Sequence, residues 1–548
     1  MTATEPSREA FAVGQRYEAG LGDRERDLGA HFTPPDIAAL LARWAFDAFD
    51  AARPGSERPA TALPVVCDPS CGGGVFLVAA ADLLVARGAD PARVVNDLII
   101  GIDLDPGAVS ASNEALRAWA DEHGVRSAVR PRVLALDAVW GEIPDAGGVG
   151  IVIGNPPFQN QLGAATARST AERTRLTERF PGAAGGYVDL AALFALRSAE
   201  LAAPGGVTAL IQPRSFLVAR DATGVRRHLL EGADLVRTWL PAAQVFAAKV
   251  DVCAVVLRKH GPSPSPAPVR PAVIVSGGRD GGIDHGAVNH DELAGAATWS
   301  PIWAQANGVP MVPAAAGPPI GGVATATAGF RDEYYGIVAH LHEQRPATAA
   351  RVVSTAMVDP AICRWGTRPV TIARQPWHTP WLDRDALAAT DERLARWVGR
   401  LMVPKVLVAT QTKVIEAVAD PEGNLVPLTP VIAVLPTAEV GIGHLEAALL
   451  APAATAWALR RFGGGGMSPT ALKLAARQLV QIPTPVDREA WDRAVRLIGA
   501  GAERSAGGED ADGARGIAWW RVVGRALNEA WAIDDDALVE WWLNRLPK

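Results

Sequence analysis

Short apolar runs alternate with helical stretches along residues 31–260 of this chain. Glycine, proline or acidic residues bound many of these runs, which is typical of buried strands. We expect strands at 64–67, 98–102, 132–135, 150–153, 207–212, 235–240 and 252–258. The longer stretches between them predict helices at 35–48, 75–87, 107–120 and 189–201. Strands that alternate with helices predict an α/β fold, with a mostly parallel sheet and helices on both faces.

The rest of the chain divides into four parts by composition. Residues 1–30 are polar and charged, and we expect an arm or a short helix there. The proline-rich segment 261–268 predicts a semi-rigid connector within a linker over 261–290. Residues 291–485 carry weak strand signals and many glycines and prolines, whereas 486–548 are helical and rich in tryptophan. We interpret this last segment as a packed helical cap rather than a functional aromatic cluster.

Composition restricts the class of protein without identifying a function. With 548 residues, 49% of them hydrophobic, the chain can bury the cores of several domains. Its formal net charge of −6 does not point to a nucleic-acid partner, although a local basic face can lie within an acidic whole. Cys67 and Cys71 have no second Cys/His pair nearby, so we expect reduced thiols and no metal. A polar N-terminus and the lack of a long apolar stretch predict a soluble, cytoplasmic protein without a membrane partner.

The segment after the first predicted strand combines a carboxylate with a glycine-rich turn. Asp68 follows the apolar run, and Gly72, Gly73 and Gly74 lead into the next helix. Glycines permit a tight turn and close approach of a ligand, and a helix N-terminus offers free N–H groups. The turn contains no Gly-Lys-Ser/Thr sequence, so a phosphate-binding loop is not indicated. Because the carboxylate would repel a pyrophosphate, the turn favours a cationic ligand.

Acidic residues also follow the second and third predicted strands. Asp103 and Leu104 come after the second strand, where nucleotide-binding sheets hold a ribose diol. Asp137 and Ala138 come after the third, where a carboxylate suits an adenine amino group. A single acid of this kind is more often a solvated loop residue. Their recurrence after consecutive strands indicates one binding edge, because ligands of open parallel sheets lie at the carboxyl ends of the strands.

The fourth predicted strand ends at Gly154, directly before the tetrapeptide Asn155-Pro156-Pro157-Phe158. Proline fixes φ and donates no hydrogen bond, so this backbone is stiff and its carbonyls can accept. The Asn155 oxygen and the Pro156 carbonyl are therefore two acceptors at a fixed separation, and Phe158 adds a flat apolar face. This combination suits a planar exocyclic amine. The alternative interpretation is a rigid turn at a strand end.

With these motifs in this order, the chain resembles the gamma-class S-adenosylmethionine-dependent DNA adenine-N6 methyltransferases of restriction-modification or phage-defence type. The resemblance covers 31–260 and begins at His31-Phe32-Thr33-Pro34-Pro35, which is similar to the family's N-terminal cofactor motif. It implies a class I methyltransferase fold, with a Rossmann-like, mostly parallel seven-stranded sheet, and S-adenosylmethionine as cofactor. Asp103 and Ala138 depart from the family, which usually has glutamate and often a larger apolar residue there. The resemblance assigns the cofactor to Thr33, Asp68, Pro69, Ser70, Cys71, Gly72, Gly74, Asp103, Leu104, Asp137, Ala138 and Asn155.

The same resemblance assigns catalysis to the tetrapeptide. It implies that the target adenine leaves the duplex and lies between Phe158 and Phe246, an aromatic residue of a later family segment. Asn155 and the Pro156 carbonyl would accept the two N6 hydrogens, Pro157 would stiffen the loop, and the methyl group would transfer directly, without a metal. Other planar amines remain open as substrates: cytosine N4, an RNA adenine or a protein glutamine.

The C-terminal half resembles the family's target-recognition domain more faintly, and Lys413 within it is assigned to the substrate. Basic residues outnumber acidic ones in 351–413, with tryptophans among them, which is typical of a DNA-binding surface or of a solvated face. We expect double-stranded DNA as the partner, in the bacterial cytoplasm at the nucleoid. A separate restriction endonuclease or defence-system subunits would supply any cleavage; alternatively, the chain is a DNA-binding modification subunit of a larger complex. The basic residues are Arg351, Arg364, Arg368, Arg374, Arg384, Arg393, Arg396, Arg400, Lys405 and Lys413.

Overall fold

The chain forms two compact units, Met1–Gly308 (unit 1) and Val309–Lys548 (unit 2). The structure is a computed structural model. It describes residues 8–20, 33–51, 63–143, 148–159, 168–185, 187–241, 243–246, 250–261, 270, 272–294, 296–312, 317–437, 439–466, 471–506 and 516–547.

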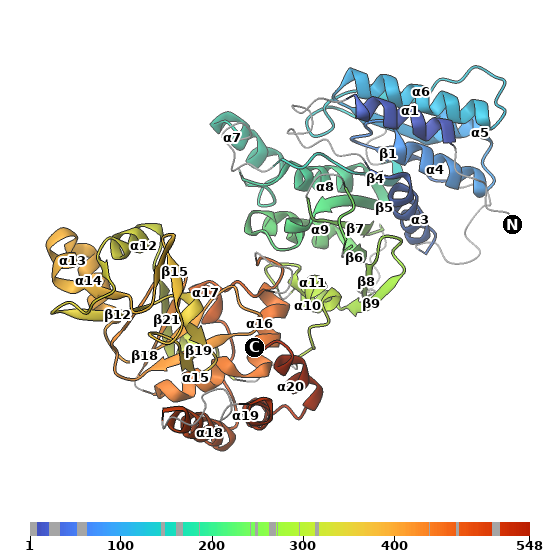
Figure 1. The fold of residues 1–548 in the computed structure, drawn as a ribbon. Helices are drawn as coiled ribbons and strands as arrows, with labels where there is room; N and C mark the ends of the chain where they lie inside the picture. Colours follow the sequence, from blue (N-terminus) through green and yellow to red (C-terminus); the bar gives the residue numbers. More distant parts are fainter. Residues whose placement is uncertain are drawn as a thin grey trace. The chain divides into compact units, whose positions relative to one another are not determined.

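Unit 1 is built on one mixed sheet, whose described strands have the order β3-β2-β1-β4-β5-β7-β6-β8-β9 (Figure 1). Strand β1 pairs in parallel with β2 and β4, and β7 runs antiparallel to β5 and β6. The part from β3 to β6 is the large mixed sheet of a class I methyltransferase-like fold, as the resemblance implied. The strands are β1 Val66–Asp68, β2 Ile99–Asp103, β3 Arg132–Ala135, β4 Val149–Gly154, β5 Ala202–Pro213, β6 Ala233–Trp239, β7 Val252–Lys259, β8 Val273–Gly277 and β9 Ile283–Val288.

Helices cover both faces of this sheet. Helices α3, α4 and α6 pack on one face, and α8 and α9 pack on the other (Figure 1). Asp105 begins α6, because its carboxylate accepts hydrogen bonds from Gly107 N and Ala108 N and Pro106 fixes the first helical φ. The helices are α1 Arg8–Ala19, α3 Pro35–Ala51, α4 Val75–Ala86, α5 Pro91–Arg93, α6 Pro106–Glu122, α7 Thr170–Arg179, α8 Leu190–Leu201, α9 Thr223–Gly232, α10 His290–Ala294 and α11 Ser300–Ala306.

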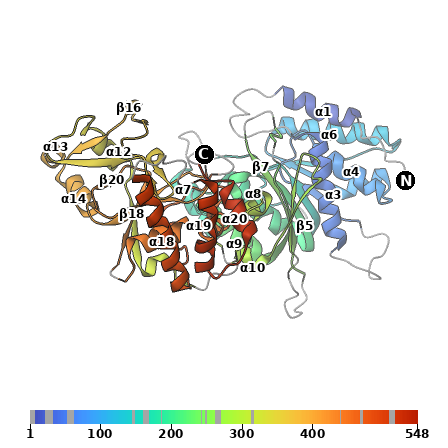
Figure 2. The ribbon, with the colours of Figure 1, turned by 60° about the horizontal axis from the view of Figure 1, so that its bottom comes forward.

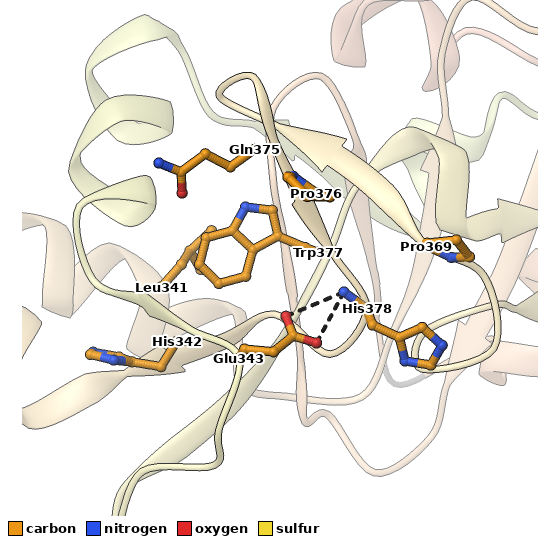
Figure 3. A pocket seen from close by; sticks show the side chains of 8 residues that line it. All are labelled: Leu341, His342, Glu343, Pro369, Gln375, Pro376, Trp377 and His378. Atoms are coloured by element: carbon orange, nitrogen blue, oxygen red, sulfur yellow. Dashed lines mark hydrogen bonds between the residues drawn. The ribbon is translucent and has the colours of Figure 1, made fainter.

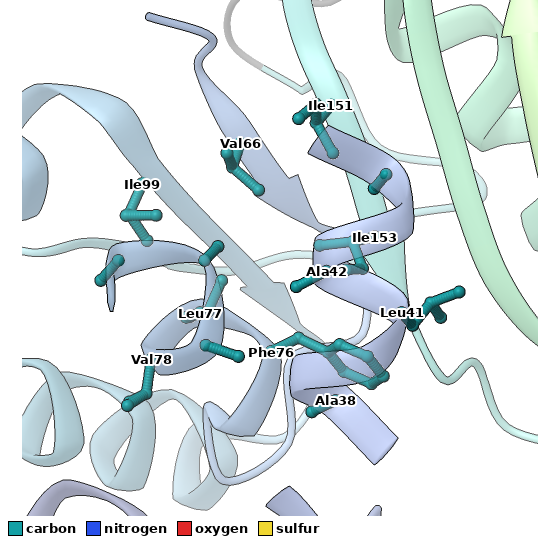
Figure 4. Packing of buried hydrophobic residues seen from close by; sticks show 14 of the residues in the cluster. Ala38, Leu41, Ala42, Val66, Phe76, Leu77, Val78, Ile99, Ile151 and Ile153 are labelled. Atoms are coloured by element: carbon teal, nitrogen blue, oxygen red, sulfur yellow. The ribbon is translucent and has the colours of Figure 1, made fainter. Parts of the chain in front are cut away.

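The core of unit 1 lies between the sheet and helices α3 and α4 (Figure 4). Ala38 and Ala42 on α3 are fully buried, and their small side chains let this helix approach the strands closely. Phe76 of α4 and Ile151 and Ile153 of β4 fill the remaining space. This packing fixes the carboxyl ends of β1 and β4 next to each other.

The strands and helices expected within 31–260 are present, with ends that shift by a few residues. The linker expected over 261–290 is different, because β8 and β9 within it extend the sheet beyond β6. Val273 and Val275 are buried while Ile274 between them is exposed, so the first three residues of β8 alternate as in a strand with one covered face. The proline-rich residues 262–269 lie outside the described residues.

Unit 2 contains two four-stranded sheets, of order β10-β21-β18-β19 and β11-β17-β12-β20, and two small hairpins, β13–β14 and β15–β16. Lys405 of β18 is fully buried and pairs with Asp420 of β19. The strands are β10 Ala324–Ala328, β11 Leu341–His342, β12 Ala349–Val353, β13 Val358–Asp359, β14 Ile362–Cys363, β15 Val370–Ile372, β16 Gln375–Trp377, β17 Trp381–Asp383, β18 Lys405–Ala409, β19 Glu416–Asp420, β20 Leu425–Pro427 and β21 Ile432–Pro436.

The C-terminal helices belong to the same compact unit. Helix α18 packs on α15 and α19, and Figure 2 shows α18, α19 and α20 beside one another. Trp491, Trp520 and Trp542 are buried there, in agreement with a packed helical cap. No single helix in the described part of the chain is long and apolar enough to cross a membrane, although the bent pair α15–α16 has the required length and composition. The helices are α12 Arg331–Val338, α13 Arg384–Thr390, α14 Glu392–Leu401, α15 Ile442–Leu450, α16 Pro452–Phe462, α17 Ala476–Leu479, α18 Arg488–Ala506, α19 Ile517–Ala530 and α20 Asp536–Leu543.

Candidate active site

The turn between β1 and α4 is shaped by two glycines with left-handed backbones. Gly72 has φ 50°, and Gly74, which precedes α4, has φ 84°. A side chain at Gly74 would also approach Ser112 Oγ to 3.1 Å. The turn begins at Asp68, which is 1% exposed and accepts a hydrogen bond from Ser70 N at 2.9 Å. Glycine is therefore needed at Gly74 for both conformation and space.

Asp103, at the end of β2, locks this turn to the neighbouring strand. Its Oδ2 accepts from Gly72 N at 2.9 Å, and its Oδ1 accepts from Asp105 N at 3.0 Å. Burial raises the pKa of the Asp103 carboxyl, while these N–H donors oppose the shift. Leu104, the next residue, is 71% exposed and presents an apolar side chain at the same edge of the sheet.

Two sets of hydrogen bonds hold the loop after β3, and the sequence predicted only one of the residues that make them. Asp137 Oδ1 accepts from Val139 N and Trp140 N, at 2.9 and 3.1 Å. Arg197 of α8, almost completely buried, donates through Nε to the Ala138 carbonyl at 3.1 Å. The same guanidinium donates to the Gly141 carbonyl at 3.0 Å. An arginine directly after the apolar run 190–196 was the available signal for this support.

The tetrapeptide after β4 lies against both cofactor motifs. A side chain at Gly154 would come within 2.6 Å of Asp68 Oδ1, so the strand end touches the buried carboxylate. Asn155 Nδ2 donates to the Thr33 Oγ1 atom at 3.0 Å, and Thr33 is buried. Because the amide nitrogen donates to Thr33, the amide oxygen is the atom that can accept a hydrogen bond from a substrate. The structure thus brings Thr33, Asp68 and Asn155 together; His31 and Phe32 lie outside the described residues.

Two buried polar atoms in this turn lack a hydrogen-bond partner within the described residues: Asp68 Oδ2 and Ser70 Oγ. Such atoms cost about 1–3 kcal/mol each unless something satisfies them. Burial raises the pKa of Asp68 to about 8, because the ionised form loses its hydration. An ammonium group placed here would supply the missing donor and ionise the carboxyl. The turn therefore fits the cationic amino-acid end of S-adenosylmethionine.

The two cysteines of this turn are buried thiols. Burial raises the pKa of Cys67 and of Cys71, and the Asp68 carboxylate adds to both shifts. The Cys71 Sγ atom lies 3.4 Å from Ser112 Oγ, whose hydroxyl donates to the Gly72 carbonyl at 2.8 Å. A protonated thiol is a poor nucleophile and a poor metal ligand, so these side chains shape the turn rather than react.

The N-terminal arm contributes to the site, which the sequence did not predict. In helix α1, a side chain at Gly14 would come within 2.5 Å of the Gly73 carbonyl oxygen, so the helix backbone rests on the glycine turn. Tyr17 of the same helix donates its hydroxyl proton to Asp105 Oδ2 at 2.5 Å. Glu122 at the end of α6 accepts from the main-chain N–H groups of Glu9 and Ala10. Helix α1 thus packs against one side of the turn, and glycine at position 14 permits this close approach.

The two aromatic residues assigned to the target base have different environments. Phe158 is partly buried against the core cluster of unit 1. Phe246 is a buried member of the same cluster, with 4% of its surface exposed. A stacking role for Phe246 therefore requires its ring to become accessible and stays a prediction. Lys413, assigned to the substrate, is an exposed residue of unit 2.

Residues 135–246 match the model of the Eco57I restriction-modification methylase family. This match covers the loop after β3, the tetrapeptide and strands β4 to β6. S-adenosylmethionine is the cofactor of this class of enzyme, as the resemblance implied.

Individual proteins are similar to parts of the chain. The type II methyltransferase M.MamI of Microbacterium ammoniaphilum is 29% identical over 159 residues, which are 28% of this chain and 41% of that protein. The type IIG restriction endonuclease BpuSI has a TM-score of 0.46 at 13% identity, over 98% of this chain and 68% of that one. The type I modification protein M.EcoKI has a TM-score of 0.32 at 20% identity, over 45% of this chain and 48% of that one. The chain thus spans less than half the length of M.MamI.

Proposed function

We propose that this chain transfers a methyl group from S-adenosylmethionine to the N6 amino group of an adenine in a specific DNA sequence. The observation that carries the proposal is the position of Asn155. Its amide nitrogen is held by Thr33, and the preceding Gly154 touches the Asp68 carboxylate. An amide acceptor for a planar amine therefore lies beside a buried acid that suits the cationic end of the cofactor.

Within this proposal, each group has a distinct task. Asp68 pairs with the cofactor's ammonium, Asp103 binds the ribose hydroxyls, and the Asp137 loop receives the cofactor's adenine. The cofactor supplies a methyl carbon activated by its sulfonium. The Asn155 oxygen and the Pro156 carbonyl accept the N6 hydrogens of an adenine that has left the duplex. By accepting these hydrogens, the two oxygens would orient the N6 nitrogen for methylation, for which the bound cofactor would supply the methyl group.

The chemistry supported here is positioning and electrostatic stabilisation. Phe158 would hold the extruded base by stacking, which is worth roughly 1–3 kcal/mol per base. The partner is double-stranded DNA. A separate restriction endonuclease or other defence-system subunits would act on the same sites, and the chain would then serve as the modification activity of the system.

The test is transfer from methyl-labelled S-adenosylmethionine to duplex DNA by the purified chain, with identification of the modified nucleoside. N6-methyladenine is expected. Label in N4-methylcytosine, or label that enters RNA or protein but not duplex DNA, would contradict the proposal and identify one of the other planar amines as the substrate.

The Asn155→Ala variant tests the site itself. We expect a loss of at least ~100-fold in the single-turnover rate, because a hydrogen-bond acceptor at the reacting nitrogen is removed. Cofactor affinity, measured by calorimetry, should change little. Asn307→Ala is the matched control, because the Asn307 side chain follows helix α11 and, among the described residues, donates to the Trp303 carbonyl of that helix. Near-normal transfer by Asn155→Ala would contradict the proposed role.

A further inference from the structure

The β15–β16 hairpin of unit 2 has an unusual tip. Ile372 pairs with Gln375, so only Ala373 and Arg374 form the loop. Both have left-handed backbones, with φ 50° and 66°. A two-residue loop of this kind normally carries Asn-Gly, because other L-residues are strained there. This hairpin retains the strain and presents a long cationic side chain at its tip.

The tip is attached to helix α12, which lies beside β15 (Figure 1). The hydroxyl oxygen of Tyr334 accepts a hydrogen bond from Ala373 N at 3.0 Å. Two large apolar side chains at this end of α12 are open to solvent, Phe330 at 78% and Tyr335 at 57%. The Arg331 guanidinium lies over the Tyr335 ring, 5.6 Å from its centre. An exposed patch of aromatic and cationic groups therefore adjoins the hairpin.

A cavity of about 520 Å³ lies along the hairpin (Figure 3). The Trp377 ring stands between Gln375 and the β11-side residues His342 and Glu343. Glu343 accepts from His378 N at 3.1 Å and from Thr379 N at 2.8 Å, which anchors the base of the hairpin. Gln375 and Pro376 beside the tip are exposed. The hairpin is therefore a braced ribbon with one polar, accessible end.

The charges at the tip are not neutralised within the described residues. Neither Arg374 nor Arg331 has a carboxylate partner there. By contrast, Arg364 and Arg368 of the same region both bind Asp359, at 2.8 and 2.7 Å. Three acidic groups belong to this region: Asp332 is exposed, Glu333 pairs with Arg393, and Glu343 accepts from the main chain at the base of the hairpin. The tip thus keeps cationic side chains for an anionic partner.

We propose that the β15–β16 hairpin reads base edges in the major groove of duplex DNA, with Arg374 and Gln375 as the contacting residues. The inference rests on the proposed function and specifies which side chains set its sequence preference. A two-stranded ribbon fits the major groove. Arginine pairs with the O6 and N7 atoms of guanine, and glutamine pairs with N6 and N7 of adenine. Arg331, on the adjoining helix, contacts phosphate.

The test uses the full chain, S-adenosylmethionine and a library of duplexes with randomised sequence. Sequencing of the methylated products gives the preference at every position. Arg374→Ala and Gln375→Ala should each retain transfer but lose discrimination at one or two positions by roughly tenfold or more. Both side chains are exposed, so thermal unfolding should be nearly unchanged.

Two variants serve as controls. Ala373→Gly relieves the strain at the tip and keeps both contacting residues, so stability should rise while the preference stays the same. Arg496→Ala removes an exposed arginine of α18 in the same unit and should leave the preference unaltered.

An unchanged preference in Arg374→Ala and Gln375→Ala would overturn the inference. So would an equal loss of affinity for all sequences, which indicates phosphate contacts only. If the unmodified chain methylates no duplex of the library, the proposed function itself fails, and the two failures are thereby distinguished.

Discussion

The turn at Asp68 in unit 1 and the arginine-rich surface of unit 2 use charge in opposite ways. Asp68 is buried, and the backbone around it touches its carboxylate directly. The arginines of 351–400 are exposed or, at Arg364 and Arg368, partly buried, and within the described residues some bind carboxylates and others do not. A buried charge depends on every neighbouring atom, whereas exposed charges contribute in small, nearly independent amounts. One added methyl group beside Asp68 should therefore greatly weaken cofactor binding. The loss of one exposed arginine from unit 2 should change DNA affinity only slightly.

The sharpest test of this difference is Gly154→Ala. The added methyl group would lie 2.6 Å from Asp68 Oδ1, and both groups belong to packed strands that cannot move apart. We expect cofactor affinity to fall by at least ~100-fold, because overpacking displaces the carboxylate. Calorimetry with S-adenosylmethionine measures this loss.

Gly232→Ala is the control for that variant, because a side chain there meets no atom within 4 Å. It should leave cofactor affinity unchanged. If Gly154→Ala bound the cofactor normally, the close contact between β4 and the Asp68 carboxylate would not matter to binding.

The ionisation of Asp68 gives the next largest effect. Since its pKa is about 8, the ligand-free carboxyl is mostly protonated at pH 7, and binding of an ammonium must expel that proton. Cofactor affinity should therefore rise by about tenfold between pH 6 and pH 7. Affinity that is constant over this range would show that Asp68 does not pair with the ligand's charge.

Asp68→Asn separates binding from folding. A folded-state pKa above the unfolded value means that the unfolded chain binds fewer protons between about pH 4 and 8, so Asp68 lowers stability as pH rises through this range. The neutral amide should therefore raise the melting temperature at pH 8 while abolishing cofactor binding. A lower melting temperature at pH 8 would contradict the assigned ionisation.

Helix α1 gives an intermediate case, because it reaches the turn from outside the sheet. In Gly14→Ala, the new methyl group would lie 2.5 Å from the Gly73 carbonyl and push the helix away. We expect roughly a tenfold loss of cofactor affinity. Alanine favours a helix over glycine, so α1 itself should not unravel. Gly499→Ala in α18, where a side chain meets nothing within 4 Å, should change stability slightly and binding not at all.

The contrast between the two regions also explains what the sequence could predict. Asp68 and Gly72 lie in one local pattern of strand, turn and helix, and Asp103 ends the next strand, so each position follows from backbone rules that act over a few residues. The sequence therefore placed these residues correctly at one edge of the sheet. Gly14 and Arg197 were missed, since their importance depends on contacts with distant segments, the Gly73 carbonyl and the Ala138 carbonyl.

In unit 2, the count of charged residues predicted a basic surface. It did not predict which of the basic residues are exposed and unpaired. Lys405, counted among the basic residues, is buried with Asp420, and Arg364 and Arg368 share Asp359. These ion pairs depend on how the chain folds, and the pattern of residues along the sequence does not predict them. The strands β8 and β9 were missed for a related reason: they are short, flanked by glycines, and stabilised by pairing with the sheet.

The smallest expected effect distinguishes paired from unpaired arginines. Arg351 is exposed and lies over the Trp365 ring, 5.3 Å from its centre, without a carboxylate partner in the described part of the chain. If it contacts a phosphate, Arg351→Ala should weaken DNA binding by a few-fold for all sequences. The slope of log affinity against log salt should become shallower by about one.

Arg364→Ala is the matched change at a paired site. Arg364 binds Asp359 at 2.8 Å, so its loss should lower the free energy of unfolding by about 1–2 kcal/mol and leave the salt slope unaltered. Titrations of a labelled duplex at several salt concentrations compare the two variants directly. Equal salt slopes for both variants and the unmodified chain would show that this side of unit 2 does not contact phosphates. Its unpaired arginines would then, like the paired ones, only face solvent.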